Sequence, residues 1–286
     1  EWPKHKSEKI AVVGAAGFVG ATEASMLSAR FGHDVAGVDV KAESVASLNG
    51  GKLVNYAPGL EAFLQDGLNA KRLSFTTKLA EAIDGREFVF LALPTPYLPN
   101  GQSDTHFLED AIGDIARLMK PGERKIVIGK STAPPSTIDK LKARIKQVGL
   151  PEGAEIELAW IPEFLREGLE VEDALGGSGR MVIGAEKPAI ADRVASLYAR
   201  ENINPKYPGK SIPIIKMGIR SAMLVKYGAN GYRATKISFS NEVSWLTAAL
   251  GFDINEISDR VGADPRIRRS FLSAGIGWGG SCFPKD

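Results

Sequence analysis

Short apolar runs alternate with longer amphipathic stretches along most of the chain. Strands that alternate with helices form right-handed βαβ units and a mostly parallel sheet. The pattern therefore predicts an α/β fold, with a first helix at residues 18–30. The runs that we expect to be strands are residues 9–13, 34–39, 72–75, 87–93, 125–129, 156–160, 181–183 and 211–215.

The pattern changes after about residue 216. Apolar residues between 219 and 250 recur mostly at a spacing of three or four, which predicts one long helix. A shorter helix is expected at 254–261. We therefore expect an α/β domain at 1–212 and an all-helical region at 213–286.

Three glycines lie between the first predicted strand and the first predicted helix: Gly14, Gly17 and Gly20. Glycine permits a tight turn and lets backbone N–H groups approach a pyrophosphate at a helix N-terminus. Asp39 ends the second strand, 19 residues after Gly20, where a carboxylate accepts hydrogen bonds from the adenosine ribose. The segment predicts a Rossmann-like site that prefers NAD to NADP, although Lys41 weakens that preference. The alternative is a purely structural turn.

The glycine spacing is one residue longer than the common Gly-x-Gly-x-x-Gly. In this respect the loop resembles the extended short-chain dehydrogenases and nucleotide-sugar epimerases. Those enzymes use a Tyr-x-x-x-Lys pair, in which lysine lowers the tyrosine pKa so that tyrosine can act as a base. Tyr232 and Lys236 match that pair. A short-chain epimerase or oxidoreductase is therefore one hypothesis.

Two further groups of residues are candidates for chemistry. Cys282 is the only thiol, and Lys285 and Asp286 follow it closely. Nearby cations favour the reactive thiolate, although a lone cysteine can also be an incidental buried residue. Lys226 and Asn230 are four residues apart and project from one face of the long predicted helix. They could stabilise an oxyanion or form an ordinary solvated face.

Polar loops follow three of the predicted strands, at residues 94–96, 131–132 and 162–167. Ligands in open parallel sheets bind beyond the carboxyl ends of the strands. Each loop alone could be a plain turn. Together with the glycine loop they indicate a lined cleft.

Composition excludes several classes of function. The 286 residues can bury a core without disulfides or metal, and 44% of them are hydrophobic. The net charge of +2 predicts no dominant attraction to nucleic acid or membrane. A single cysteine and three scattered histidines make neither a disulfide nor a zinc pattern, so we expect no metal and a reducing, cytoplasmic setting. No signal peptide is visible, and no apolar run approaches the roughly 20 residues that span a bilayer.

The segment Gly-Gly-Ser-Cys-Phe-Pro-Lys-Asp at 279–286 resembles the nucleophile motif of the UDP-glucose/GDP-mannose dehydrogenase family. Its phenylalanine after cysteine is typical of the UDP-glucose branch. Lys-Ser-Thr at 130–132, Pro-Glu-Phe-Leu-Arg-Glu-Gly at 162–168 and Val-Lys-Tyr-Gly-Ala-Asn at 225–230 are further motifs in the family order. The short-chain hypothesis leaves Cys282 without a role.

The resemblance implies NAD-dependent oxidation of a nucleotide-sugar C6 alcohol to the carboxylate in two steps, with UDP-glucose as the expected sugar. Cys282 would form a thiohemiacetal and then a thioester, which water hydrolyses. It implies a catalytic set of Cys282, Lys226, Asn230, Asp286, Glu167 and Thr132. It implies a cofactor set of Gly14, Gly17, Val19, Gly20, Asp39, Thr95, Thr132, Glu167 and Lys285. It implies a substrate set of Glu163, Lys226, Asn230, Arg266, Phe271, Leu272, Ser273, Gly275 and Gly279.

The resemblance also carries expectations about assembly. The family is dimeric or larger, so we expect a homodimer through the helix at 219–250, with Arg266 reaching a neighbouring subunit's nucleotide-sugar. The family continues past the cysteine motif into a second nucleotide-binding α/β domain, which we expect to be absent from this chain. If nothing follows Asp286, we expect NAD binding without efficient catalysis. The longer glycine loop is expected to alter the pyrophosphate contact. Ala57, where the family often has glutamate, and the pair Arg268 and Arg269 leave the choice of nucleotide-sugar open.

Overall fold

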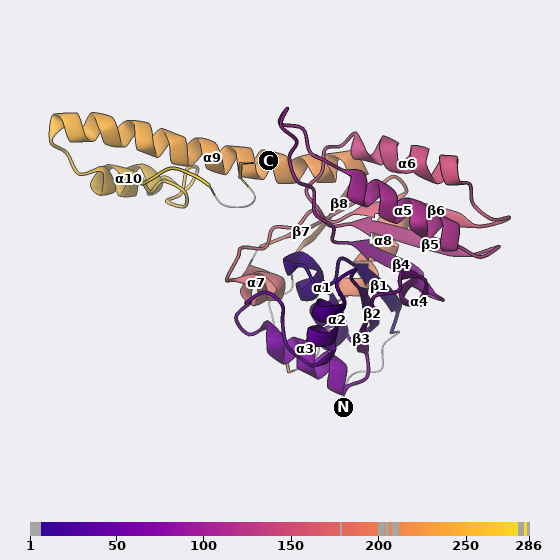
Figure 1. Ribbon diagram of the computed structural model, residues 1–286. Coiled ribbons are helices and arrows are strands. Elements are labelled where there is room, and N and C mark those ends of the chain that lie inside the picture. Colours follow the sequence, from indigo (N-terminus) through magenta and orange to yellow (C-terminus); the bar gives the residue numbers. More distant parts are fainter. Residues whose placement is uncertain are drawn as a thin grey trace. The chain divides into compact units, whose positions relative to one another are not determined.

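The computed structural model describes residues 7–177, 179–199, 203, 206–207, 212–279 and 283–284. The chain divides into two compact units, and each is described here by itself (Figure 1). The first unit comprises Glu1–Leu98 and Gln102–Leu224, and the second comprises Pro99–Gly101 and Val225–Asp286.

The first unit is built on one sheet of eight strands in the order β3-β2-β1-β4-β5-β6-β7-β8. All neighbouring strands are parallel except β6 and β7, so the predicted mostly parallel sheet is confirmed. The strands are β1 (Lys9–Val13), β2 (Asp34–Val38), β3 (Leu73–Thr76), β4 (Phe88–Leu91), β5 (Arg124–Gly129), β6 (Glu155–Trp160), β7 (Met181–Ala185) and β8 (Ile214–Met217).

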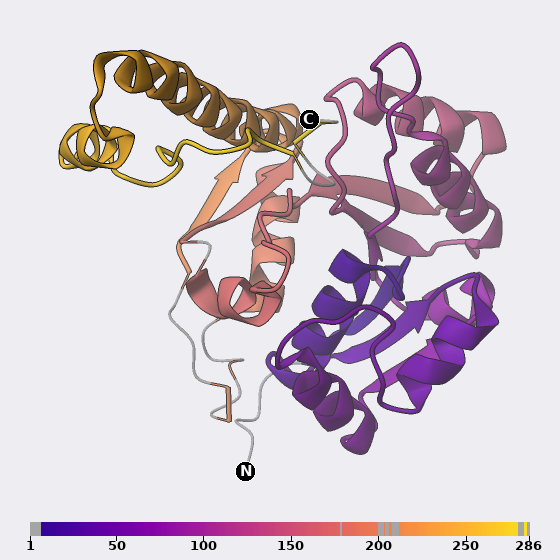
Figure 2. The ribbon, with the colours of Figure 1, turned by 60° about the vertical axis from the view of Figure 1, so that its left-hand side comes forward.

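Helices cover both faces of this sheet (Figure 2). Successive strand residues point to opposite faces, so Phe88 and Phe90 of β4 join one core while Val89 and Leu91 join the other. The helices of this unit are α1 (Phe18–Ala29), α2 (Ala42–Asn49), α3 (Leu60–Asn69), α4 (Leu79–Ile83), α5 (His106–Leu118), α6 (Thr137–Val148), α7 (Glu170–Glu172) and α8 (Pro188–Ala195). Residues of α1, α2, α3 and α8 pack in the first core, and residues of α4, α5 and α6 pack in the second.

Strand β7 runs antiparallel to β6 because no crossover connection returns the chain to the edge of the sheet where β6 begins. The connection from β6 to β7 holds only a loop, α7, a π-helical turn at Asp173–Gly177 and the residues that follow it. A strand that follows such a connection starts at the edge where β6 ended, so it pairs antiparallel to β6.

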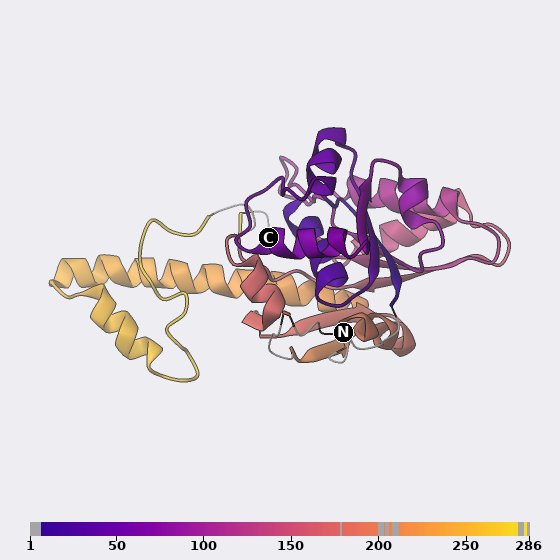
Figure 3. The same ribbon diagram turned by 90° about the horizontal axis from the view of Figure 1, so that it is seen from below.

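The second unit consists mainly of α9 (Ile219–Leu250) from Val225 onward and of α10 (Ile254–Gly262), and α10 runs back along α9 (Figure 3). The bounds of α9 are those predicted from its periodicity. Gly251, at φ 75°, ends the helix in the left-handed conformation that favours glycine. The Asp253 side chain accepts the Asn255 N–H at 2.8 Å and caps α10. None of the helices within the described ranges combines the length and apolar character needed to cross a membrane.

The division between the units lies after Leu224, later than the boundary expected near residue 212. The strand β8 follows that expected boundary but is paired with β7 in the sheet. Ile219 and Met223, in the first turns of α9, pack in the core of the first unit. The start of the long helix therefore belongs to the α/β unit.

Candidate active site

The glycine loop has room for glycine alone at two positions. Gly14 has φ 81°, and a Cβ there would lie 2.5 Å from the carbonyl oxygen of Ala92. A Cβ on Gly20 would lie 2.1 Å from the carbonyl oxygen of Gly14. The N–H groups of Gly14 and Ala15 donate to the carbonyl of Val38 at 2.9 and 3.1 Å. The loop is thus pressed against the ends of β2 and β4.

Ala16, between the first two glycines of this loop, contacts Asp39 and Asn55. The Ala16 N–H donates to Asp39 Oδ2 at 3.0 Å, and the Asn55 amide donates to the Ala16 carbonyl at 3.3 Å. The Lys41 N–H donates to Asp39 Oδ1 at 3.2 Å. These contacts orient the half-buried Asp39 carboxylate, whose oxygens can each accept a further hydrogen bond from a ribose hydroxyl.

The start of α1 can receive a phosphate. Gly17, the N-cap residue, has no side chain that could satisfy the N–H groups of the first helical turn. Val19 is half-buried and Gly20 is buried in that turn. The close packing of Gly20 against Gly14, the helix N-terminus without a side-chain cap and the carboxylate of Asp39 together fit a dinucleotide.

Two predicted residues from neighbouring loops lie together. The Thr95 hydroxyl, which is buried, donates to the carbonyl of Thr132 at 2.7 Å. The Ser131 hydroxyl donates to the carbonyl of Leu93 in the same pair of loops. The loops that follow β4 and β5 are therefore fixed to each other at the carboxyl edge of the sheet.

A buried ion-pair cluster joins the loop after β5 to the loop after β6. The Lys130 ammonium lies 2.8 Å from Glu163 Oε2 and 3.0 Å from Glu23 Oε2, and the Tyr198 hydroxyl donates to Glu23. Burial disfavours the charged form of Lys130, but attraction to Glu163 and Glu23 outweighs it and raises the lysine pKa above its usual range. Burial and the neighbouring Glu23 raise the pKa of Tyr198, which therefore stays neutral.

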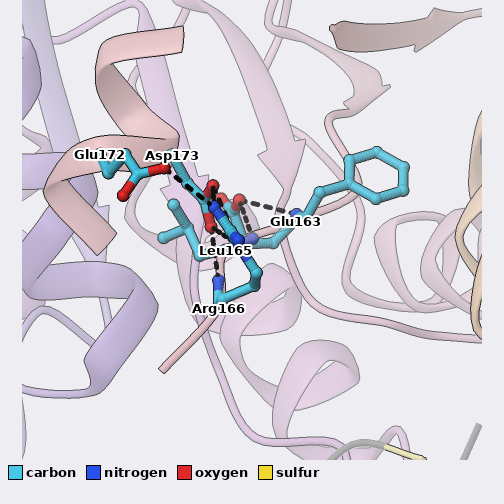
Figure 4. A network of polar contacts seen from close by, with 6 residues as sticks. Glu163, Leu165, Arg166, Glu172 and Asp173 are labelled. Atoms are coloured by element: carbon cyan, nitrogen blue, oxygen red, sulfur yellow. Dashed lines mark hydrogen bonds and ion pairs between the residues drawn. The ribbon is translucent and has the colours of Figure 1, made fainter. Parts of the chain in front are cut away.

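The loop at 162–168 is held by the carboxylates of Glu163 and Asp173 (Figure 4). Glu163 Oε1 accepts the N–H groups of Phe164 at 2.7 Å and Leu165 at 3.0 Å. The Arg166 guanidinium binds the buried Asp173 carboxylate at 2.6 Å, and this hydrogen bond raises the arginine pKa. Glu163, predicted to contact substrate, thus already has three partners inside the protein.

The same loop borders a cavity of about 190 Å³. Its polar walls include Glu23, Lys130 and Tyr198, and its apolar walls include Met26 and Phe31. The sequence interpretation missed Glu23 and Tyr198. The available signal was that Glu23 is the only charged residue in the segment that forms α1.

In the second unit, Lys226 and Asn230 lie one turn apart on α9 and are only 7% and 4% exposed. The alternative prediction, that these two side chains form a solvated helix face, is therefore wrong. The Asn230 side-chain oxygen accepts a hydrogen bond from Arg233 at 3.1 Å. Both groups keep the spacing at which an ammonium and an amide can act on one oxygen atom.

The pair required by the short-chain hypothesis has other surroundings. The Lys236 ammonium donates to the carbonyls of Ile267 at 3.0 Å and Arg268 at 3.1 Å. Tyr232 is 64% exposed. Lys236 therefore fixes the turn after α10, and the structure gives no support to a Tyr232–Lys236 catalytic pair.

Apart from Lys226 and Asn230, the predicted substrate residues of the second unit lie in the segment that follows α10. Arg266 is 87% exposed on its side chain and pairs with Asp264 at 2.6 Å. Phe271 lies 5.4 Å from the Arg233 guanidinium, and Leu272 is buried. The remaining predicted residues are Ser273, Gly275 and Gly279. The Ser273 hydroxyl accepts a hydrogen bond from Arg269 at 3.1 Å, and the Gly275 N–H donates to the Asn241 side-chain oxygen at 2.8 Å. Gly279 is exposed.

Three predicted residues, Cys282, Lys285 and Asp286, lie outside the described residues. Glu167 is described and exposed. The structure therefore brings together Thr95 with Thr132 and Glu163 with Lys130, and keeps Lys226 beside Asn230.

Comparison with known proteins agrees with these features. The sequence matches the profile of the UDP-glucose/GDP-mannose dehydrogenase family, NAD binding domain, at residues 8–202 and the central domain of that family at 220–286. It is 37% identical to a UDP-glucose 6-dehydrogenase of Haloferax volcanii, over 97% of this chain and 63% of that protein. It is 38% identical to a UDP-glucose 6-dehydrogenase of Pseudomonas aeruginosa, over 97% of this chain and 59% of that protein.

Solved structures give the same result. A UDP-glucose dehydrogenase from Pyrobaculum islandicum superimposes with a TM-score of 0.89 at 36% identity, covering 98% of this chain and 62% of that one. A GDP-mannose dehydrogenase from Pseudomonas aeruginosa gives a TM-score of 0.82 at 33% identity, covering 97% and 62%. The chain thus spans about three fifths of the length of these relatives. With its NAD-binding and central domains both matched, the chain belongs to the UDP-glucose/GDP-mannose dehydrogenase family.

Proposed function

We propose that this chain takes part in the NAD-dependent oxidation of a nucleotide-sugar C6 alcohol to the carboxylate. UDP-glucose is the proposed substrate and UDP-glucuronate the product, because both sequence relatives above are UDP-glucose 6-dehydrogenases. The observation that carries the proposal is the meeting of four loops at the carboxyl edge of one sheet. The glycine loop, the two loops joined by Thr95 and Thr132, and the loop held by Glu163 all follow strands of that sheet.

Both oxidations use NAD as the proposed hydride acceptor. NAD bound at the glycine loop supplies a hydride acceptor for each of them. We propose that the Asp39 carboxylate accepts hydrogen bonds from the adenosine ribose hydroxyls. The pyrophosphate is bound by the loop and helix start that contain Gly14, Gly17, Val19 and Gly20. Thr95 and Lys285 complete the proposed cofactor contacts.

Cys282 is the proposed nucleophile. After the first oxidation, its thiolate attacks the aldehyde carbon, and the carbonyl oxygen becomes the hydroxyl of a thiohemiacetal. Loss of a second hydride and the hydroxyl proton gives a thioester. Water then attacks the thioester carbon, the C–S bond breaks, and the carboxylate leaves. One alcohol, one water and two NAD+ thereby give one carboxylate, two NADH and three protons.

The other proposed residues act around that carbon. Lys226 and Asn230 stabilise the oxyanion, because preorganised donors are most effective where negative charge develops. Thr132 and Glu167 position the water, and Asp286 assists proton transfer near the thiol. The segment containing Phe271, Leu272, Ser273, Gly275 and Gly279 contacts the nucleotide-sugar, together with Arg266, whose guanidinium suits phosphate.

A homodimer through α9 is the proposed assembly. Large apolar side chains on this helix are exposed, among them Phe239 at 53%, Trp245 at 77% and Leu246 at 60%. Exposed apolar patches of this kind mark interaction sites. A reactive thiol also requires a reducing compartment, so we propose a cytoplasmic location.

The count of NADH per sugar consumed tests the reaction. The intact protein is supplied with NAD+ and, separately, with a panel of UDP- and GDP-sugars. Two NADH per UDP-glucose are expected. One NADH or none at saturating UDP-glucose would contradict the four-electron reaction, and a higher kcat/KM for another nucleotide-sugar would replace UDP-glucose as the substrate.

A further inference from the structure

Four polar side chains from four separate segments, two of them buried and two half-buried, form one continuous chain of contacts. They are Tyr198 in the short helix Ser196–Tyr198, Glu23 in α1, Lys130 after β5 and Glu163 after β6. The side chains of Lys130, Glu23 and Glu163 are 4%, 10% and 19% exposed. We call these four residues the Lys130 network.

Every charged group of the Lys130 network has partners inside the protein. Lys130 binds both carboxylates, Tyr198 donates to the remaining oxygen of Glu23, and two backbone N–H groups donate to the remaining oxygen of Glu163. A buried carboxylate without such donors would be strongly unfavourable. The network borders the cavity beside α1, but its polar atoms are already paired with one another. We therefore interpret it as a link between segments of the first unit.

Glu23, Lys130 and Glu163 lie in segments with different proposed roles. Glu23 is in the second turn of α1, the helix that begins at the glycine loop. Glu163 binds the N–H groups of Phe164 and Leu165 and thereby sets the backbone of the loop that carries Glu167. Lys130 is two residues before Thr132, in the loop fixed to Thr95.

We propose that Glu23, Lys130 and Tyr198 are positioning residues that act through Glu163. They fix the loop at 162–168 relative to the cofactor helix and the loop after β5. The link depends only on contacts within the first unit. Its catalytic consequence rests on the proposed function, because only that function gives the loop substrate and water to position.

Hydrogen exchange tests the link without reference to activity. Glu23→Gln keeps the volume of the side chain and removes its charge, so the electrostatic attraction between residue 23 and the Lys130 ammonium is lost. The amide hydrogens of Phe164 and Leu165 should then exchange at least about tenfold faster, which corresponds to ~1.4 kcal/mol of lost protection. Amides in β1 should be unaffected.

The matched control is Glu61→Gln, an exposed glutamate on α3. It should leave exchange at 162–168 unchanged. Glu163→Ala is the positive control, because it removes the acceptor of both N–H groups. If Glu23→Gln and Tyr198→Phe both fold normally and neither speeds exchange at Phe164 and Leu165, the link is overturned.

Kinetics of the intact enzyme then test the catalytic consequence. Glu23→Gln should raise KM for the nucleotide-sugar severalfold while leaving KM for NAD and the thermal stability near those of Glu61→Gln. An effect on stability alone would reduce the network to a structural role and refute the positioning proposal. Faster exchange in a protein that oxidises no nucleotide-sugar would instead retain the link and refute the proposed function.

Discussion

At the residue scale, the site depends on positions where a side chain must be absent and on positions where a charge must be paired. Gly20 is the first kind, because a Cβ there would overlap the Gly14 carbonyl. Lys130 is the second kind, because its two carboxylate partners are the reason that a buried ammonium keeps its proton. Neither requirement depends on the reaction, so both can be tested by stability and binding.

Gly20→Ala should destabilise the first unit by about 1–3 kcal/mol, the usual range for overpacking, and should weaken NAD binding. The measurements are thermal unfolding and an NAD titration. Gly17→Ala is the matched control for stability, since its Cβ would meet the Gly14 carbonyl at an ordinary 3.4 Å. Equal melting temperatures for the two variants would contradict the steric argument.

Cys282→Ala should abolish turnover and leave NAD affinity unchanged, because the thiol is proposed to act only on the sugar carbon. Lys226→Ala should raise the barrier by on the order of 3 kcal/mol, or about a hundredfold in kcat. Steady-state rates and an NAD titration measure both effects. Uronate release at the wild-type rate by the cysteine variant would exclude Cys282 as nucleophile.

At the element scale, the first turns of α9 are attached to the α/β unit. Ile219 and Met223 pack in its core, and Arg220 binds Asp139 of α6 through two hydrogen bonds of 2.6 and 2.8 Å. The hydrogen bond from Arg220 lowers the pKa of Asp139. The ion pair therefore joins α6 to the long helix in a pH-dependent manner.

A carboxylate whose pKa is lower in the folded state stabilises the protein above its unfolded pKa, which is about 3.9 for aspartate. This contribution is lost as the pH falls through the folded pKa. Asp139→Asn should therefore lower the melting temperature slightly at pH 7, and the difference should vanish at the acid end of a pH series. Arg220→Gln should have the same effect, and the double variant should add nothing further. A difference that persists unchanged in acid would exclude the ion pair as its cause.

At the scale of the whole molecule, the exposed apolar side chains of α9 predict self-association. Trp245→Glu should place a charge in the proposed interface and convert the dimer to a monomer, halving the mass measured by light scattering. Thr235→Glu, at an exposed polar position of the same helix, is the matched control and should remain dimeric. A wild-type protein that is monomeric at micromolar concentration would contradict the proposal.

The sequence by itself determined the elements and the type of site. Hydrophobic periodicity predicted β1 and α9 with their observed bounds, and the glycine spacing with Asp39 predicted the dinucleotide loop. Such patterns are local, because each depends on residues within one or two turns or strands. Only the tertiary structure decided the antiparallel pairing of β7, the contact of Ala16 with Asp39, and the link from Tyr198 through Glu23 and Lys130 to Glu163. These contacts join residues far apart in the chain, so they depend on how the strands are ordered in the sheet, and no local period encodes that order.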